Sequence, residues 1–378
     1  MTSGLPDVEA AFLERFGEAA AAVVRAPGRV NLVGEHTDYN DGFVLPMAID
    51  REVRIALRPR DDGRVTLAAL DLADEAGFDL AGLTRGEGWI EYVKGVSWAL
   101  TQSGLALSGW DGVLAGDVPV GAGLSSSAAL ELAAARAFQA SAGFAWEPER
   151  MARLCQRAEN AWVGVNSGIM DQLISALGRE GHALLLDCRS LAGEAVPLPP
   201  GHAVVVLDTG TRRGLVGTAY NERRAQCEAA ARHFGVPALR DITPETLEAG
   251  AEGLGALPLK RARHVVSENA RTLAAAEAMR RGDAAGLGRL MTASHVSLRD
   301  DFEVSSEALD AIQACALRQA GCLGARMTGA GFGGCAVALV EEAAVDAFVT
   351  GVKGCYDAGE RRADAYVCRP AEGASRLR

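Results

Sequence analysis

The sequence predicts an α+β protein of two domains. Its 378 residues exceed what one ordinary hydrophobic core accommodates. Segments typical of strands and helices follow one another irregularly, without the regular βαβα order of a doubly wound sheet. Hydrophobic residues make up 49% and charged residues 23%, as in soluble globular proteins. We expect domains at 1–180 and 181–378, with the Gly-rich turn at 178–181 or the Pro/Gly-rich piece at 193–201 as the linker.

Periodicity and composition predict the elements of the first half in order. Apolar residues at Val93, Val96 and Leu100 recur at helical spacing, and the segment after the serine cluster is rich in Ala, Leu and Glu. β-branched and other apolar runs bounded by Gly, Asp or Pro predict strands. The expected elements are helix 7–17, strands 21–25, 43–49 (continuing through 51–58) and 65–69, helix 92–102, strand 113–115, and helices 125–143, 147–163 and 169–177.

The same signals continue through the second half, and we find no internal repeat or low-complexity tract. Short apolar runs predict strands, and longer Ala-, Glu- and Arg-rich segments predict helices. The expected elements are strands 183–187 and 203–208, helices 221–234 and 261–280, strand 335–340, helix 343–352 and strand 363–368.

Charge and cysteine usage exclude several classes of protein. A net charge of -11 argues against a nucleic-acid partner, which rewards a basic face, although a few local cations can still hold a phosphorylated ligand. The cysteines form no CxxC pair and no metal-ligand spacing with histidine. We therefore expect reduced, mostly buried thiols, as in a cytosolic protein. The eight are Cys155, Cys188, Cys227, Cys315, Cys322, Cys335, Cys355 and Cys368.

No segment indicates targeting to or insertion into a membrane. The N-terminus lacks a basic stretch followed by an apolar one, so we expect no signal peptide. The longest apolar runs, such as 203–207 and 336–340, are of strand length and too short to span a bilayer. These features predict a cytoplasmic protein without a membrane partner.

A glycine- and serine-rich loop at 119–127 runs directly into the predicted helix that follows. Its glycines let backbone N–H groups approach an anion, and the helix N-terminus adds unpaired donors and the positive end of the dipole. The three serines offer capping oxygens and a hydroxyl for a metal ion. An ordinary turn with a serine cap is the simpler explanation, but loop, serines and long helix together favour an anion site.

Two better-known nucleotide motifs do not fit. No GK[ST] follows the glycines at 121 and 123, so the loop is not a Walker A sequence. A literal GxGxxG occurs at 329–334, but a predicted strand follows it where a dinucleotide site needs a helix. The phosphate loop therefore belongs to another kind of nucleotide site.

The segment 28–39 is unusually dense in different polar groups. It places acids, a base, a histidine, an amide and a phenol beside the apolar run Val30-Leu32-Val33, which should be buried. Solubility does not need such variety, whereas recognition of a small hydroxyl-rich molecule does. The polar residues are Arg29, Asn31, Glu35, His36, Asp38 and Tyr39.

Three segments together resemble the GHMP family of small-molecule kinases: 28–39, 119–128 and 324–335. The first, with its extension 40–46, resembles the galactokinases within that family. Shorter matches at 92–95, 168–172 and 263–269 extend the similarity over nearly the whole chain. The resemblance implies a two-domain GHMP kinase fold, with a mixed-sheet N-terminal domain (ribosomal protein S5 domain 2-like), a ferredoxin-like C-terminal domain and the active site in the cleft between them.

The resemblance also implies the reaction. The protein would use ATP and Mg²⁺ to phosphorylate the anomeric hydroxyl of α-D-galactose, giving galactose 1-phosphate in galactose catabolism by the Leloir pathway, and would act as a monomer. Asp171 would accept the proton of that hydroxyl, and its place in the first turn of a short helix favours the anion. Arg29 would keep Asp171 ionised and offset charge on the transferred phosphoryl group. A helix-cap acid and a structural ion pair are the alternatives.

The resemblance further assigns ligands by position. Carboxylates accept hydrogen bonds from sugar hydroxyls, and a site that pairs each hydroxyl discriminates against epimers. The implied sugar ligands are Glu35, His36, Thr37, Asp38, Gly168 and Tyr220. The implied nucleotide ligands are Gly121, Ala122, Gly123, Leu124, Ser125, Ser126 and Ser127, with Trp89 and Tyr92 near the adenine. Ser127 and Glu159 would bind Mg²⁺, which takes few protein oxygens besides phosphate and water.

Other functions remain open from the sequence. An N-acetylgalactosamine kinase or another sugar 1-kinase could use the same scaffold, and Asn166-Ser167 departs from the Pro-Cys common in the family, which affects pocket shape. A non-catalytic galactose sensor is a third candidate, but the intact Ser127-Ala128-Ala129 and Asp171 favour catalysis. A mevalonate- or homoserine-type kinase would not need the 28–39 segment.

Overall fold

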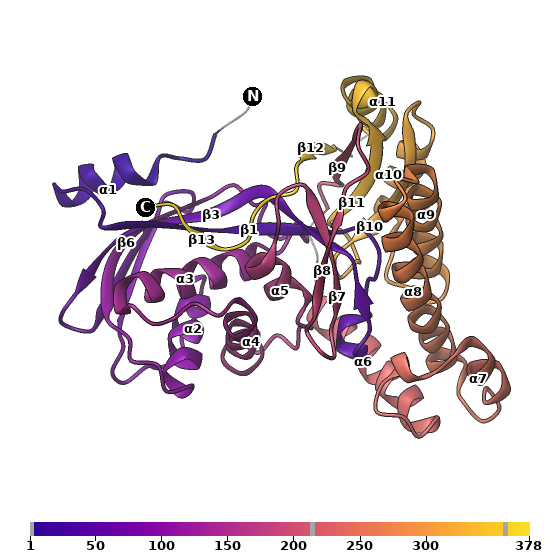
Figure 1. The fold of residues 1–378 in the computed structure, drawn as a ribbon, viewed down its shortest axis with the longest axis horizontal. Coiled ribbons are helices and arrows are strands. Elements are labelled where there is room, and N and C mark those ends of the chain that lie inside the picture. The colour runs from indigo at the N-terminus through magenta and orange to yellow at the C-terminus, as the bar shows by residue number, and fades with distance from the viewer. Residues whose placement is uncertain (1–3, 212–215, 358–361) are drawn as a thin grey trace.

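The computed structural model describes residues 4–211, 216–357 and 362–378, and it confirms the α+β class. Three sheets and the helices that cover them form two adjoining parts (Figure 1). The first part is built on long strands from the N-terminal half. The second contains the long helices α8 Ala256–Arg280 and α9 Ala284–Asp300, which run side by side.

A six-stranded sheet organises the first part, in the order β13-β1-β3-β6-β4-β5. All its neighbours are antiparallel except β4 and β6. Strand β13, near the C-terminus, was missed in the sequence analysis and pairs with β1. The bounds are β1 Ala22–Asn31, β3 Pro46–Arg60, β4 Arg64–Ala69, β5 Asp74–Asp79, β6 Gly109–Gly116 and β13 Ser375–Arg376.

Both faces of this sheet are covered, which explains why its central strands are apolar on both sides. One face carries Val23 and Ala56 and packs against helix α1 Val8–Phe16. The other carries Val24 and Ile55 and is covered by four helices. These are α2 Ile90–Gln102, α3 Ser126–Ala142, α4 Pro148–Ala158 and α5 Met170–Leu177. Of the four, α2, α3 and α5 contact the strands, while α4 packs on these helices.

The predicted helix 147–163 divides into two elements. It begins as α4 and continues as a π-helical turn, Glu159–Val163. π turns widen a helix locally and are frequent at functional sites. The turn buries Glu159 beside α5. Periodicity could not predict it, because a single i→i+5 turn of five residues is too short to change the apolar spacing of the whole segment.

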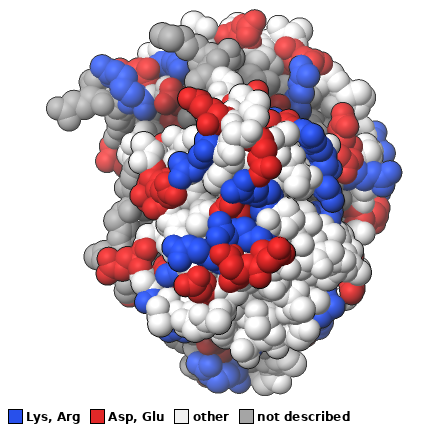
Figure 2. All heavy atoms as spheres, turned by 90° about the vertical axis from the view of Figure 1, so that its left-hand side faces the viewer, with Lys and Arg blue, Asp and Glu red and all other residues white. Residues whose placement is uncertain are grey.

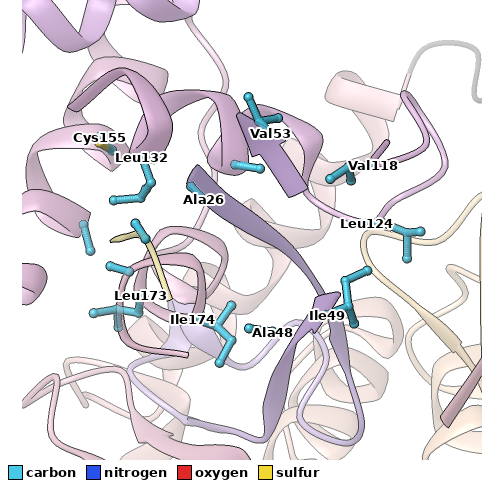
Figure 3. Close-up of a cluster of buried hydrophobic side chains, with 14 of the residues drawn as sticks. Ala26, Ala48, Ile49, Val53, Val118, Leu124, Leu132, Cys155, Leu173 and Ile174 are labelled. Carbon is cyan, nitrogen blue, oxygen red and sulfur yellow. The ribbon is translucent and has the colours of Figure 1, made fainter. Parts of the chain in front are cut away.

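The hydrophobic core under the sheet also anchors the phosphate loop (Figure 3). Val118 and Leu124, on either side of the loop's glycines, are buried in the cluster that includes Ala26 and Ile49. The loop's exposed backbone is therefore held at both ends by apolar packing.

A three-stranded sheet connects the two halves of the chain, in the order β2-β7-β8. Its strands are β2 Phe43–Val44, β7 His182–Asp187 and β8 Gly193–Pro197. The expectation that 193–201 is a linker is therefore wrong, because its first residues form strand β8, which pairs with β7. Because β7 pairs with β2, residues beyond 180 still contact the first half. The boundary at 180/181 stays a prediction.

The second part contains a ferredoxin-like sheet, as the resemblance implied. Its order is β10-β11-β9-β12 and every pairing is antiparallel. The strands are β9 His202–Asp208, β10 Cys322–Thr328, β11 Cys335–Glu341 and β12 Asp364–Cys368; the helices besides α8 and α9 are α6 Val216–His233, α7 Pro244–Ala249, α10 Glu307–Leu317 and α11 Val345–Tyr356. Sequence analysis missed α7, α9, α10 and β10.

One pair of cysteines contradicts the expectation of eight reduced thiols. Cys315 on α10 and Cys355 on α11 form a disulfide that closes a sequence separation of 40 residues. The error arose because no local spacing marks two cysteines that meet only through packing of two helices. The other six form no disulfide within the described residues, and all but Cys322 are buried.

Charged residues on the face at the left of Figure 1 are of both signs and intermixed (Figure 2). Charges of both signs side by side produce no uniform field on this face. Asp111 on β6 is buried and accepts hydrogen bonds from Arg58 and Arg60 on β3. Among the helices that the structure describes, none has the length and apolar content to cross a membrane.

Candidate active site

A cavity of about 840 Å³ lies between the two parts and is lined by residues from both. The first part contributes the phosphate loop and the 28–39 segment. The second contributes Tyr220 and Asn221 from α6, and Gly329 and Ala330 from the loop after β10. The predicted site residues that line it are Arg29, Glu35, His36, Asp38, Trp89, Tyr92, Gly121, Gly123, Ser125, Ser126, Ser127, Glu159, Gly168, Asp171 and Tyr220.

Arg29 and Asp171 form a bidentate pair in this cavity. The arginine Nε lies 2.8 Å from Oδ1, and Nη2 lies 2.7 Å from Oδ2. The Arg29 side chain is 5% exposed, whereas that of Asp171 is 26% exposed. The predicted proximity is confirmed, and so is the position of Asp171 in the first turn of α5. The carboxylate is held rigidly yet still reaches the cavity.

The same arginine supports the phosphate loop. Its Nη1 donates to the Gly123 carbonyl at 2.6 Å, and its backbone N–H donates to the Leu124 carbonyl at 3.0 Å. Gly28 also approaches closely, since a Cβ there would lie 2.7 Å from the Leu124 oxygen. Through Arg29, strand β1 therefore binds the Asp171 carboxylate and also supports the phosphate loop.

The loop has the backbone of an anion-binding turn. Gly121 and Gly123 have φ of 71° and 87°, where glycine avoids the cost of a side chain. Ser125 has φ of 61°, which is strained for a residue with a Cβ. Its hydroxyl donates to Asp171 Oδ2, so the expectation that it caps α3 is wrong. Ala122 and Leu124 bury their side chains, which leaves only their backbone for a ligand.

Two predicted sugar ligands are acids held in a desolvated setting. Glu35 is 2% exposed, and burial raises its pKa while Arg326, which binds its Oε2 at 2.8 Å, lowers it. Burial, and then the charge of Asp171, raise the pKa of Asp38 to about 6. Both acids line the cavity, where a sugar hydroxyl could replace their lost hydration.

His36 is neutral and oriented by two contacts. Burial lowers its pKa to about 3. Its Nε2 lies 3.2 Å from the Ala330 carbonyl, which can only accept, so this nitrogen carries the proton. Its Nδ1 therefore accepts from the Tyr39 hydroxyl at 2.8 Å. The loop after β10 thus contacts the 28–39 segment directly.

The remaining predicted sugar ligands occupy different environments. The Tyr220 ring packs 5.5 Å from that of His36, and the Gly168 backbone partly offsets the rise that burial causes in the pKa of Tyr220. Gly168 leaves room for Asp38, since a Cβ there would lie 1.7 Å from the Asp38 Oδ2. Thr37 lies behind the cavity, fully buried, with its hydroxyl donating to the Gly34 and Phe43 carbonyls. Its side chain holds the turn and is not aimed at a ligand.

Ser127 and Glu159 come together as a hydroxyl–carboxylate pair beside the phosphate loop. Glu159 Oε2 also accepts from Ser167 at 2.5 Å and from the Gln172 amide at 2.9 Å. In the part of the chain that the structure describes, no three His, Cys, Asp or Glu side chains gather as a metal cluster. Two oxygen donors facing a phosphate site nevertheless suit Mg²⁺, which completes its shell with phosphate and water.

Two aromatic residues line the other end of the cavity. Trp89 precedes α2, and its indole N–H donates to Asp74 at 2.9 Å. Tyr92 lies one turn further on, and burial raises its pKa to about 12. Apolar side chains also line the cavity, including Leu72, Leu114 and Leu130. Aromatic and apolar groups of this kind can stack on and enclose a flat heterocycle.

Sequence reasoning missed several residues that shape the site from behind. Arg326 binds Glu35, Glu268 accepts the Gly34 and Glu35 N–H groups, and Gln172 and Ser167 donate to Glu159. Three of them, Gln172, Glu268 and Arg326, lie within the noted segments 168–172, 263–269 and 324–335, so the segments were visible while their contacts were not.

Comparison with protein families agrees with these features. A profile of the galactokinase galactose-binding signature matches residues 10–59. Profiles of the N-terminal and C-terminal domains of GHMP kinases match residues 91–179 and 275–358. The matched regions contain the polar segment 28–39, the phosphate loop and the loop after β10.

Full-length relatives are similarly informative. The chain is 50% identical to a galactokinase of Roseiflexus sp. (strain RS-1) over 373 residues, covering 97% of this chain and 95% of that protein. It is 48% identical to a galactokinase of Chloroflexus aurantiacus over 379 residues, covering 98% and 97%.

Solved structures agree as well. The crystal structure of Lactococcus lactis galactokinase complexed with galactose superposes with a TM-score of 0.93 at 37% identity, covering 98% of each chain. A mevalonate kinase structure shares the fold alone, with a TM-score of 0.66 at 18% identity over 92% of this chain and 99% of that one. The chain therefore belongs to the galactokinase family of the GHMP kinases.

Proposed function

We infer that this protein is an active galactokinase that transfers the γ-phosphoryl group of ATP to the anomeric hydroxyl of α-D-galactose, yielding galactose 1-phosphate and ADP. The observation that carries this proposal is the Arg29–Asp171 pair beside the phosphate loop. It supplies a proton acceptor and a cation at the place where an alcohol would meet a terminal phosphate.

The proposed step follows from the geometry of Asp171. Its Oδ1 accepts one described hydrogen bond, from Arg29, and its Oδ2 accepts two, from Arg29 and Ser125. A carboxylate oxygen can accept twice, so Oδ1 retains capacity for the sugar's O1–H. Asp171 takes that proton as the O1–phosphorus bond forms and the bond between the γ-phosphorus and the β,γ-bridging oxygen breaks.

Arg29 serves both ligands in this proposal. Three of its N–H groups are engaged with Asp171 and the Gly123 carbonyl. Its remaining donors and its charge lie beside the loop, where they would offset the negative charge that spreads over the phosphoryl oxygens. Because the base and the cation are one rigid unit, little reorganisation is needed during the transfer.

We further propose Mg²⁺ as the metal, bound by the Ser127 hydroxyl and the Glu159 carboxylate. When bound, it would neutralise phosphate charge and orient the γ-phosphoryl group. Gln172 and Ser167 hold the Glu159 carboxylate in place for this role. Backbone N–H groups of the loop at 121–127 would bind the phosphates, and Trp89 and Tyr92 would lie near the adenine.

Galactose would be bound by Glu35, His36, Asp38, the Gly168 backbone and Tyr220. The two acids accept from hydroxyls, while neutral His36 presents a ring that packs against Tyr220. Thr37 supports the turn rather than the sugar. We also propose that the protein works as a monomer, and use of ATP favours the cytoplasm as the place of action.

The experiment that tests this function is a coupled ADP-release assay across galactose, glucose, N-acetylgalactosamine and mevalonate. We expect the highest kcat/KM for galactose, with release of one ADP for each galactose 1-phosphate. A higher kcat/KM for N-acetylgalactosamine than for galactose would show that N-acetylgalactosamine is the preferred substrate. Binding of galactose and ATP without turnover would indicate a non-catalytic sensor.

A further inference from the structure

One carboxylate oxygen, the backbone N–H and the backbone carbonyl of Glu35 are each bound by a residue of the C-terminal half. We propose that Arg326, Glu268 and His264 are positioning residues that fix the backbone and carboxylate of Glu35, so that the C-terminal half determines the affinity and selectivity of the sugar site. This inference rests on the proposed function, because it assigns Glu35 to the sugar.

The carboxylate of Glu35 is bound by Arg326 on β10. The arginine Nη2 lies 2.8 Å from Glu35 Oε2, and Nη1 donates to the Asn31 carbonyl at 2.8 Å. The Arg326 side chain is 0% exposed and that of Glu35 is 3% exposed. Arg326 is therefore aimed by two bonds at the segment that faces the cavity, and a carboxylate so held has little rotational freedom.

The backbone N–H of Glu35 is bound from α8. Glu268 Oε1 accepts the N–H of Gly34 at 2.8 Å and that of Glu35 at 3.3 Å. Arg271 binds the other oxygen of Glu268 at 2.7 Å, and Ser294 donates to Oε1 at 2.6 Å. These donors stabilise Glu268 as an anion inside the protein. The turn at Gly34, which has φ of 99°, thereby gains a fixed anchor.

The backbone carbonyl of Glu35 is bound by the same helix, one turn earlier. His264 Nε2 lies 3.0 Å from that oxygen, and its Nδ1 lies 2.8 Å from the Ser297 hydroxyl. A carbonyl only accepts, so Nε2 carries the proton and Nδ1 accepts from Ser297. Burial lowers the pKa of His264 to about 4, in agreement with this neutral form.

These contacts explain why the segment 263–269 carries polar residues that stay outside the cavity lining. His264 and Glu268 are four residues apart and so lie on one face of α8, both directed at Glu35. A purely structural role would stabilise the whole fold. A positioning role predicts instead that galactose affinity falls much more than nucleotide affinity. The reason is that the bonds end on Glu35, a proposed ligand of the sugar, and not on the phosphate loop.

The test compares galactose and ADP affinities by calorimetry in Arg326→Met, Arg326→Lys and Glu268→Gln. For Arg326→Met we expect galactose affinity to fall about 10- to 100-fold, since a buried carboxylate loses its partner, while ADP affinity changes less than about twofold. Arg326→Lys keeps the charge but cannot make both bonds, so it should fall between wild type and Arg326→Met. In steady state, KM for galactose should rise more than kcat falls.

Arg280→Met is the matched control. Arg280 also lies on α8, but its ion pair with Glu194 is exposed and distant in sequence from His264 and Glu268. This variant should bind both ligands as wild type does. If Arg326→Met does not fold, Arg326→Lys and Glu268→Gln carry the comparison, with thermal unfolding used to confirm that each is folded.

A double-mutant cycle separates positioning from general weakening. If Arg326 acts through Glu35, then Glu35→Gln combined with Arg326→Met should bind galactose within about threefold of the weaker single variant. Additive losses would overturn the proposal, as would wild-type galactose affinity in Arg326→Met or equal losses for galactose and ADP. A wild-type protein that binds no galactose would overturn the proposed function and this inference together, whereas the other outcomes leave the function intact.

Discussion

Arg29 and Asp171 are separated by 142 residues and meet through two hydrogen bonds, Nε–Oδ1 at 2.8 Å and Nη2–Oδ2 at 2.7 Å. The first comes from a central strand and the second from the first turn of α5. Because Arg29 also binds the Gly123 carbonyl, the pair links the proposed base to the phosphate loop. Displacement of either residue would change the distance between the two substrates.

Replacement of the proposed base should reduce turnover without abolishing sugar binding. Asp171→Asn retains the shape of the side chain but cannot accept the proton, and we expect kcat to fall about 10²- to 10⁴-fold. Galactose affinity measured by calorimetry should change little, because the other sugar ligands remain. Wild-type turnover in this variant would contradict the role of Asp171.

The contact between Gly168 and Asp38 makes a steric prediction. A Cβ at position 168 would lie 1.7 Å from Asp38 Oδ2, so Gly168→Ala must displace the carboxylate. We expect KM for galactose to rise about tenfold or more, equivalent to an overpacking cost of about 1–3 kcal/mol. Gly164→Ala, in the same loop, meets nothing within 4 Å, and its φ of 93° adds backbone strain that Gly168→Ala lacks. A smaller rise in KM for Gly164→Ala would therefore assign the loss in Gly168→Ala to the contact with Asp38.

The environment of Asp38 predicts a pH dependence of sugar use. Its pKa is raised from 3.8 to about 6, so the folded protein keeps this carboxyl protonated below about pH 6. A protonated carboxyl accepts fewer hydrogen bonds from a sugar, and kcat/KM for galactose should therefore rise as pH increases through 6. Asp38→Asn should bind more weakly but lack this part of the profile. If wild type and Asp38→Asn show the same rise of kcat/KM with pH, a group other than Asp38 causes that rise.

The same shift has a consequence for stability. Between pH 4 and 6 the folded state binds more protons at Asp38 than the unfolded state, so the free energy of unfolding falls as pH rises through this window. The stabilisation is fully present below the unfolded pKa and lost above the folded one. Urea unfolding at pH 4 to 8 should show a smaller decline for Asp38→Asn than for wild type.

The disulfide between α10 and α11 should stabilise the C-terminal domain without affecting catalysis. Closing a sequence separation of 40 residues restricts the unfolded chain, and its reduction should lower the free energy of unfolding by about 2–4 kcal/mol. Neither Cys315 nor Cys355 lines the cavity, so kcat should not change. Denaturant unfolding with and without a reductant measures this, and Cys315→Ser should show no response to the reductant.

Sequence reasoning was most successful where chemistry is concentrated in short segments. The polar run at 28–39, the loop at 119–127 and the resemblance of both to galactokinases predicted the fold class and family that the comparisons show. Gly121 and Gly123, which were predicted to let the backbone approach an anion, have φ of 71° and 87°. These properties depend on residues close in sequence, and a local pattern can report them.

Other pairings were decided only by the tertiary structure. It directs Ser125 to Asp171 rather than to a helix cap, turns 193–197 into a strand, and joins Cys315 to Cys355. It also brings Arg326, 291 residues away, onto Glu35. A side chain's partner is whichever group packing brings within about 3 Å, and no local pattern encodes contacts between segments so distant along the chain.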